Sequence, residues 1–132
     1  MKKLLFCLIA LLALPVVLAD ISVTHSYEQK QDGVHIHVII KTESAEKFDL
    51  AELIPENWQI ANWTANTGAQ FESVAGEFMG KDCNINHWKF DSITKDTEVV
   101  YRISPKQAGN YELVSVWFYP NGFNMGKLSI KI

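Results

Sequence analysis

Two histidines separated by one residue, His35 and His37, are the strongest chemical signal in the sequence. They lie in the segment GVHIHVII, whose alternation of apolar and polar residues predicts a β-strand. Side chains two positions apart on a strand share one face and stand about 7 Å apart, so both imidazoles could reach one metal ion. A zinc site needs a third and usually a fourth protein ligand. The pair therefore indicates either a metal site or two polar positions on an ordinary strand.

Three other residues could supply a third ligand: His25, Cys83 and His87. His25 shares the apolar face of its own segment, whereas His35 and His37 lie on the face opposite the apolar residues of theirs. If the two segments share a core, His25 therefore points to the opposite side. Cys83 and His87 could approach only through a tertiary contact. We favour two solvent-facing histidines and expect no cofactor, with a metal-binding protein that uses His35 and His37 as an alternative.

The sequence has no pattern typical of an enzyme. It lacks the Gly-x-Ser-x-Gly turn that presents a nucleophilic serine in many hydrolases. Cys83 and His87 could act as nucleophile and base, but no third group is evident that would orient the histidine. The carboxylates are scattered, which gives no support to the paired acids of glycoside hydrolysis. We expect a protein without catalytic activity.

Aromatic residues are the remaining candidates for a binding site. We expect Trp58, Trp88 and Trp117 to pack in the core, because each lies on an alternating apolar face. Other rings are expected at the surface, where they could stack on sugars or anchor a protein partner. The candidate ligand-binding residues are Trp63, Phe118, Tyr119 and Phe123.

The first 19 residues have the pattern of a secretory signal peptide. Lys2 and Lys3 precede an apolar run at residues 4–18, and the small residue Ala19 stands at the expected cleavage site. The apolar run is about 15 residues long, shorter than the roughly 20 that span a bilayer. The sequence thus predicts a signal peptide at 1–19 and one secreted domain at 20–132, extracellular or periplasmic. No integral membrane span is expected after cleavage, and an uncleaved anchor is the alternative.

The charge and the cysteine content of the predicted secreted domain restrict the kinds of partner that it can bind. Without Lys2 and Lys3 the 12 basic residues become 10, against 15 acidic ones, so the secreted domain has a net charge near −5. An acidic domain without a basic stripe is a poor candidate for binding nucleic acid. Loss of the signal peptide also removes Cys7, which leaves Cys83 alone. That cysteine is expected to be buried, paired in an intermolecular disulfide, or reactive.

Short segments of alternating polarity between turn signals predict an all-β fold. About seven strands in one domain of this length are typical of an immunoglobulin-like antiparallel β-sandwich. Residues 42–58 are the least strand-like and are expected to hold a short strand or helical turn around 48–53. Residues 81–84 are expected to form a loop. The expected strands are 21–28, 34–41, 58–64, one or two within 71–80 broken at Gly76, 85–90, 97–104, 111–119 and 127–132.

Three segments, LIPENWQI, HWKFDSI and VVYRISPKQAGNYEL, resemble the immunoglobulin-like repeat domain of bacterial and archaeal cell-surface and secreted proteins. The resemblance covers roughly residues 48–113. It departs from the family at Asn57, where a glycine is usual. The resemblance implies a sandwich used as a spacer, adhesion or binding module, without catalytic residues or a cofactor.

Together these observations predict a secreted, non-catalytic binding, adhesion or accessory module of the cell envelope. The expected partner is an envelope or extracellular protein. One alternative is a carbohydrate-binding module that holds a glycan with exposed aromatic rings. The other is the metal-binding protein that uses the histidine pair.

Overall fold

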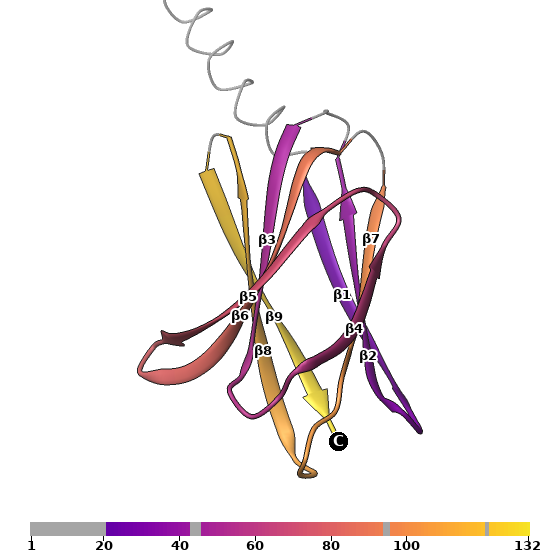
Figure 1. Ribbon diagram of the computed structural model, residues 1–132, viewed down its shortest axis with the longest axis vertical. Helices are drawn as coiled ribbons and strands as arrows, with labels where there is room; N and C mark the ends of the chain where they lie inside the picture. Colours follow the sequence, from indigo (N-terminus) through magenta and orange to yellow (C-terminus); the bar gives the residue numbers. More distant parts are fainter. Residues whose placement is uncertain (1–20, 43–45, 94–95, 121) are drawn as a thin grey trace, which may run out of the picture.

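The computed structural model describes residues 21–42, 46–93, 96–120 and 122–132, which form strands and turns (Figure 1). The predicted signal peptide at 1–19, with Cys7, lies outside these residues, so its cleavage stays a prediction. The strands are β1 (Ser22–Lys30), β2 (Gly33–Lys41), β3 (Glu46–Pro55), β4 (Ile60–Ala65), β5 (Gln70–Phe78), β6 (Lys81–Ile93), β7 (Thr97–Ile103), β8 (Asn110–Tyr119) and β9 (Gly122–Lys131).

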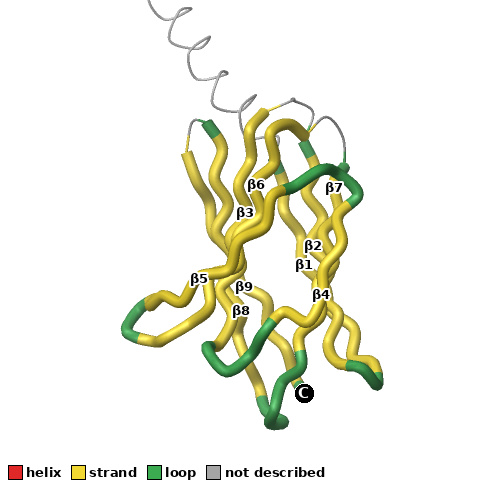
Figure 2. Tube along the Cα trace, in the orientation of Figure 1, coloured by secondary structure: helices red, strands yellow, loops and turns green. Residues whose placement is uncertain are grey.

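The strands form two antiparallel sheets that face each other (Figures 1 and 2). The four-stranded sheet has the order β1-β2-β7-β4, and the five-stranded sheet has the order β5-β6-β3-β8-β9. All pairings between neighbouring strands are antiparallel. The predicted all-β sandwich is therefore confirmed.

The strand order contains an immunoglobulin-like arrangement with one addition. In that fold four strands form one sheet in the order A-B-E-D, and three form the other in the order C-F-G. Here β1-β2-β7-β4 follows the first order and β3-β8-β9 follows the second. The hairpin of β5 and β6 is inserted between β4 and β7 in the chain and extends the second sheet beyond β3. With this hairpin the described residues hold nine strands, two more than the seven of the immunoglobulin arrangement.

The core fills the space between the sheets. Trp58, Trp88 and Trp117 are exposed by only 2%, 0% and 7%, which confirms the prediction that they pack inside. Trp88 on β6 stacks on Tyr101 of β7, with ring centroids 5.4 Å apart, so these rings join the two sheets directly. Burying a large aromatic side chain contributes about 1.5–3 kcal/mol, and such rings dominate the core.

One local prediction was right only in part, and two were wrong. The segment expected to hold a short strand or helical turn around 48–53 is the ten-residue strand β3. Strand β5 runs through Gly76 without interruption, and residues 81–84 begin β6 instead of forming a loop. Strand β3 is the central strand of the five-stranded sheet, and its residues are covered on both faces. A strand covered on both faces loses the alternation that identifies strands in sequence.

The turn between β1 and β2 depends on Gly33. Its φ of 136° lies in a region that residues with a Cβ rarely adopt. A Cβ at this position would also lie 2.5 Å from the backbone oxygen of Ile103 on the neighbouring strand β7. The glycine therefore allows β2 to begin against β7.

We predict that Gly33→Ala lowers the free energy of unfolding by about 1–3 kcal/mol, because it adds both backbone strain and a clash with a backbone atom. Chemical denaturation followed by tryptophan fluorescence measures this change. Gly68→Ala is the matched control, since a Cβ there meets nothing within 4 Å. Equal losses in the two variants would contradict the role given to Gly33.

Candidate functional site

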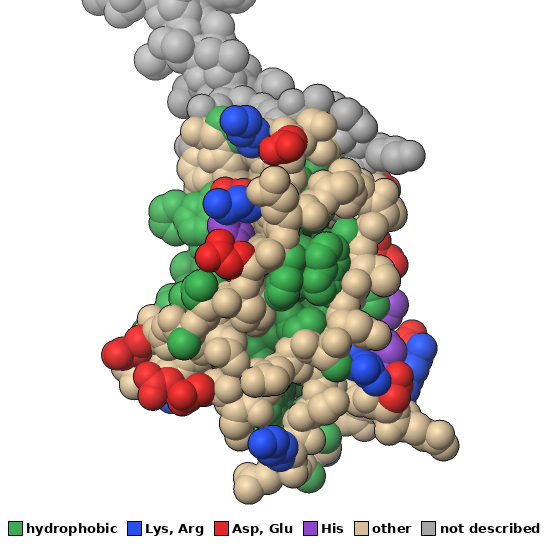
Figure 3. All heavy atoms as spheres, viewed as in Figure 1, with side chains coloured by type: hydrophobic (Ala, Val, Ile, Leu, Met, Phe, Trp, Pro, Cys, Tyr) green, Lys and Arg blue, Asp and Glu red, His purple; other side chains and the backbone are tan. Residues whose placement is uncertain are grey.

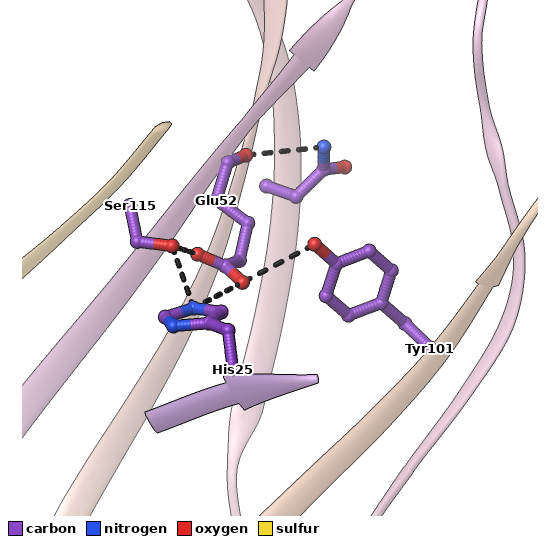
Figure 4. A network of polar contacts seen from close by, with 5 residues as sticks. His25, Glu52, Tyr101 and Ser115 are labelled. Atoms are coloured by element: carbon purple, nitrogen blue, oxygen red, sulfur yellow. Dashed lines mark hydrogen bonds and ion pairs between the residues drawn. The ribbon is translucent and has the colours of Figure 1, made fainter. Parts of the chain in front are cut away.

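Four polar side chains meet between the sheets, in the middle of the apolar core (Figure 4). His25 comes from β1 and Tyr101 from β7 in the four-stranded sheet. Glu52 comes from β3 and Ser115 from β8 in the five-stranded sheet. Glu52 and Ser115 are each 2% exposed, and the His25 side chain is 8% exposed. We call this group the core polar cluster.

The carboxylate of Glu52 is the centre of the core polar cluster. His25 Nε2 lies 2.9 Å from its Oε1 and 2.7 Å from Ser115 Oγ. The Ser115 hydroxyl donates to Oε2, and the Tyr101 hydroxyl donates to Oε1 at 3.2 Å. Because Ser115 uses its one proton on the carboxylate, the bond between the serine and His25 requires a proton on Nε2. Every polar side chain of the cluster therefore has a partner.

The presence of Ser, His and Glu does not make the core polar cluster a catalytic triad. In a triad, the serine and the carboxylate contact opposite nitrogens of the imidazole, so that one orients the base while the other loses a proton to it. Here Ser115 and Glu52 both contact Nε2 of His25. The serine also donates to the carboxylate, and its side chain is buried. The arrangement ties the two sheets together and activates no nucleophile.

Burial controls the ionisation of this cluster. Removal from water raises the pKa of the Glu52 carboxyl above its ordinary value of 4.5, against the opposing effects of the bonds from His25 and Tyr101. Burial, together with the nearby carboxyl of Glu52, raises the pKa of the Tyr101 phenol well above its ordinary value. A carboxyl with a raised pKa binds its proton more tightly in the folded state, so protonation of Glu52 stabilises the fold.

Sequence reasoning placed His25 on the core face and missed its partners. Two positions in the sequence could have indicated these partners. Glu52 interrupts an apolar run from Leu50 to Ile54, and Ser115 lies on the core face of β8 between Leu113 and Trp117. A polar residue at a core position predicts a buried partner, since an unpaired one costs free energy. Nothing in the sequence specified which residues would meet.

The histidine pair lies on the outer surface of the four-stranded sheet. His35 Nε2 is 2.9 Å from Asp32 Oδ1, and His37 Nδ1 is 3.9 Å from Glu98 Oε1. The bond from His35 holds the pKa of Asp32 below its ordinary value. His87, a third ligand considered from sequence, belongs to the other sheet. Among the described residues, no group of three or more His, Cys, Asp or Glu side chains is placed to hold a metal ion.

The structure separates the four candidate aromatic residues. Trp63 lies on β4 and packs against Phe71 with ring centroids 5.4 Å apart. Phe118 and Phe123 face each other across β8 and β9, 6.0 Å apart, and are 43% and 62% exposed. Tyr119 packs against the core. These residues therefore do not form one platform, although Phe118 and Phe123 form an exposed pair.

That pair belongs to a larger apolar surface on the outside of the five-stranded sheet. Residues opposite each other in neighbouring antiparallel strands project from the same face, and the pairings Phe118–Phe123 and Val116–Met125 place their side chains there. Buried residues of β3 and β6 fill the middle of the same surface. We call this surface the outer apolar face. Its residues are Ala51, Leu53, Val74, Phe78, Cys83, Ile85, Val114, Val116, Phe118, Phe123 and Met125.

The outside of the four-stranded sheet is predominantly polar. Ile39 and Val100 are its apolar exceptions. Figure 3 shows histidines and charged side chains on the flank of the molecule that this sheet forms. Its polar residues are Ser22, Thr24, Ser26, Glu28, Lys30, His35, His37, Lys41, Asn62, Thr64, Glu98 and Arg102. The two outer surfaces of the sandwich thus differ in chemistry.

Cys83 lies within the outer apolar face and is 7% exposed. It packs in one cluster with Ala51 and Leu53. Burial raises the pKa of its thiol, which disfavours the reactive thiolate. Of the three states expected for this cysteine, the structure has the buried one, and the intermolecular disulfide stays a prediction.

The chain was compared with known protein families, curated proteins and solved structures. No protein-family model and no curated protein matches this sequence. Among solved structures, the chain is similar to the cohesin module from Clostridium perfringens ATCC13124 family 33 glycoside hydrolase. The two are 16% identical with a TM-score of 0.47, over 85% of this chain and 96% of that one. Membership of the immunoglobulin-like repeat family stays a prediction. No helix in the described part of the chain is long and apolar enough to cross a membrane.

We predict that Glu52→Leu and Glu52→Gln differ strongly in stability at pH 7. The leucine removes the acceptor of Tyr101 and the carboxylate bonded to His25 and Ser115, at about 1–3 kcal/mol for each buried polar group that it leaves without a partner. The glutamine keeps an acceptor for Tyr101 and removes the cost of a buried charge. Urea denaturation of both variants and the wild type gives the comparison.

The same variants test the ionisation of Glu52. As the pH falls from 7 toward 4.5, the wild type should gain stability relative to Glu52→Gln, because its folded state takes up a proton that the glutamine variant cannot bind. His25 is present in both proteins. Parallel stability curves over this pH range would show that burial does not raise the pKa of Glu52.

Proposed function

We propose that this protein is a non-catalytic binding module of the cell envelope, which contacts an envelope or extracellular protein through the outer apolar face. One observation carries the proposal. Phe118, Phe123 and Met125 lie side by side on an open sheet surface and are 43%, 62% and 46% exposed. Figure 3 shows hydrophobic side chains protruding on that flank of the molecule.

An exposed group of large apolar side chains costs free energy unless another molecule covers it. Contiguous apolar surface on a soluble protein marks an interaction site more often than scattered apolar residues do. Aromatic residues and methionine are enriched at protein interfaces, and buried aromatic anchors carry much of the binding energy. The pair formed by Phe118 and Phe123 fits that role.

The charges that border the outer apolar face favour a protein partner. Asp49 lies 3.8 Å from His87, and Glu112 lies 3.9 Å from Lys127, so both signs occur at its margin. An anionic nucleic acid or lipid surface would instead be met by a basic patch. A polar margin of mixed sign around an apolar centre is the usual anatomy of a protein–protein interface.

The place of action follows from the sequence. The signal peptide expected at 1–19 would direct the domain outside the inner membrane, to the periplasm or the extracellular space. We therefore propose a partner that belongs to the envelope or lies outside the cell. The alternative of a glycan-binding platform is less well supported, because Trp63 belongs to the four-stranded sheet whereas Phe118 and Phe123 belong to the five-stranded one.

Site-specific photo-crosslinking tests the proposal. Phe123→p-benzoylphenylalanine places the crosslinker on the outer apolar face, and Ser26→p-benzoylphenylalanine places it on the opposite sheet. In the native host we expect a defined protein adduct from position 123 and not from position 26. Mass spectrometry identifies the partner, which is then purified for binding measurements.

With the purified partner, Phe123→Ser and Met125→Ser should each raise the Kd about 10- to 100-fold, as expected for loss of an interface anchor. His37→Ser, on the polar surface of the other sheet, is the matched control and should leave the Kd unchanged. A Kd unaffected by the first two variants, or lowered affinity only in the third, would reject the outer apolar face as the binding surface.

A further inference from the structure

The two sides of the sandwich are closed to different degrees. On one side β1 lies against β9, where Gln29 Nε2 donates to the Lys131 carbonyl at 2.7 Å and Lys131 N donates to the Tyr27 hydroxyl at 3.2 Å. On the other side β4 and β5 are the edges of their sheets, and residues 66–69 cross from one sheet to the other between them (Figure 2). A hollow of about 240 Å³ opens there.

The hollow between β4 and β5 differs from two others in having no charged residue in its lining. Figure 3 looks onto this side and shows apolar side chains in the opening between the sheets. Two other hollows carry charges: one of about 590 Å³ includes Glu56, Lys81 and Asp82, and one of about 270 Å³ includes charged residues of β8 and β9. The hollow between β4 and β5 has an uncharged lining. Its residues are Gln59, Ile60, Phe71, Ser73, Asn84 and Asn86.

The two asparagines are held by hydrogen bonds that their side-chain NH₂ groups donate. Asn84 Nδ2 donates to the backbone oxygens of Glu56 and Trp58, at 3.0 and 3.1 Å. Asn86 Nδ2 donates to the backbone oxygens of Glu52 and Asn84, at 3.4 and 3.3 Å. Since a carbonyl oxygen can bond only to the NH₂ end of an amide, these contacts fix the orientation of both groups. Asn86 is only 2% exposed, so its position is set by the core.

An aromatic ring supplies the apolar part of the hollow. Phe71 packs against Trp88 with ring centroids 4.9 Å apart and against Trp63 at 5.4 Å. This packing holds the ring of Phe71 in place beside the polar groups. The hollow therefore combines a fixed aromatic surface with oriented amide groups and the Ser73 hydroxyl.

We propose that this hollow binds a neutral, hydroxyl-rich ligand of the size of a single sugar ring. The ligand's hydroxyl groups donate to the oxygens of Asn84 and Asn86 and accept from Ser73 or Gln59, while its C–H face packs on Phe71. The volume is below the usual range of drug-sized pockets, about 300–1,000 Å³, which sets the size of the ligand. The uncharged lining disfavours a charged ligand, whose desolvation would go uncompensated.

This site is independent of the proposed protein-binding surface, which lies on the outside of the five-stranded sheet. It also differs from the aromatic platform expected from sequence. Of the four residues named for that platform, none lines the hollow, although Trp63 contacts its lining residue Phe71. The other three belong to β8 and β9.

The test is a titration of the purified domain with glucose, galactose and N-acetylglucosamine, with glucuronate as the charged comparison. Binding is followed by NMR through the side-chain amide resonances of Gln59, Asn84 and Asn86, and by tryptophan fluorescence. We expect saturable shifts at these amides with at least one neutral sugar, with millimolar affinity for so small a ligand, and weaker binding of glucuronate.

Gln59→Ala and Ser73→Ala change exposed residues and should each weaken sugar binding about tenfold, while the fold is retained. Phe123→Ser is the matched control: it should impair partner binding and leave the sugar titration unchanged. The proposal is overturned by the absence of saturation with all three neutral sugars, by tighter binding of glucuronate, by shifts centred on Phe118 and Phe123, or by unchanged affinity in both hollow variants.

Discussion

The buried carboxyl of Glu52 is the constraint on which the arrangement of the two sheets depends. It lies on the central strand of the five-stranded sheet and is 2% exposed. A carboxyl in an apolar interior is tolerated only when neighbouring groups replace the hydrogen bonds of water. Here those groups come from β1, β7 and β8. A shift of any of these strands by one residue would turn its polar side chain out of the core. The hydrogen bonds that Glu52 needs therefore favour one register for β1, β3, β7 and β8.

With the sheets fixed in this way, their outer surfaces are free to differ. Strand β3 carries Glu52 on its inner side and Ala51 and Leu53 on its outer side, where they form the middle of the outer apolar face. The β5–β6 hairpin widens this surface, because it adds Ile85 and Val74 next to Leu53. The same hairpin brings Phe71, Ser73 and Asn86 to the hollow between the sheets. One insertion into an immunoglobulin-like arrangement therefore contributes to both candidate sites.

The sequence allowed the fold class and most strand faces to be predicted, because alternation of polarity reports which side of a strand is covered. His25, Trp88 and Ile130 all lie on the faces expected for them. Prediction was incomplete at β3, where burial on both faces removes the alternation, and it failed at the start of β6, where the exposed residues Lys81 and Asp82 are typical of a loop. The candidate sites were predicted only in part. Phe118 and Phe123 were recognised as exposed rings, whereas the hollow joins Gln59 to Asn86 through long-range pairing that local patterns do not specify.

The core polar cluster has a consequence for the order in which the chain can fold. His25 is bonded to Glu52, 27 residues further along, and to Ser115, 90 residues further along. Chains emerge from synthesis with the N-terminus first, at about 5–20 residues per second. Strand β1 therefore exists for several seconds before β8, and during that time His25 lacks its serine partner. Contacts so distant in sequence close late and slowly. The core polar cluster can therefore be completed only after β8 has been made.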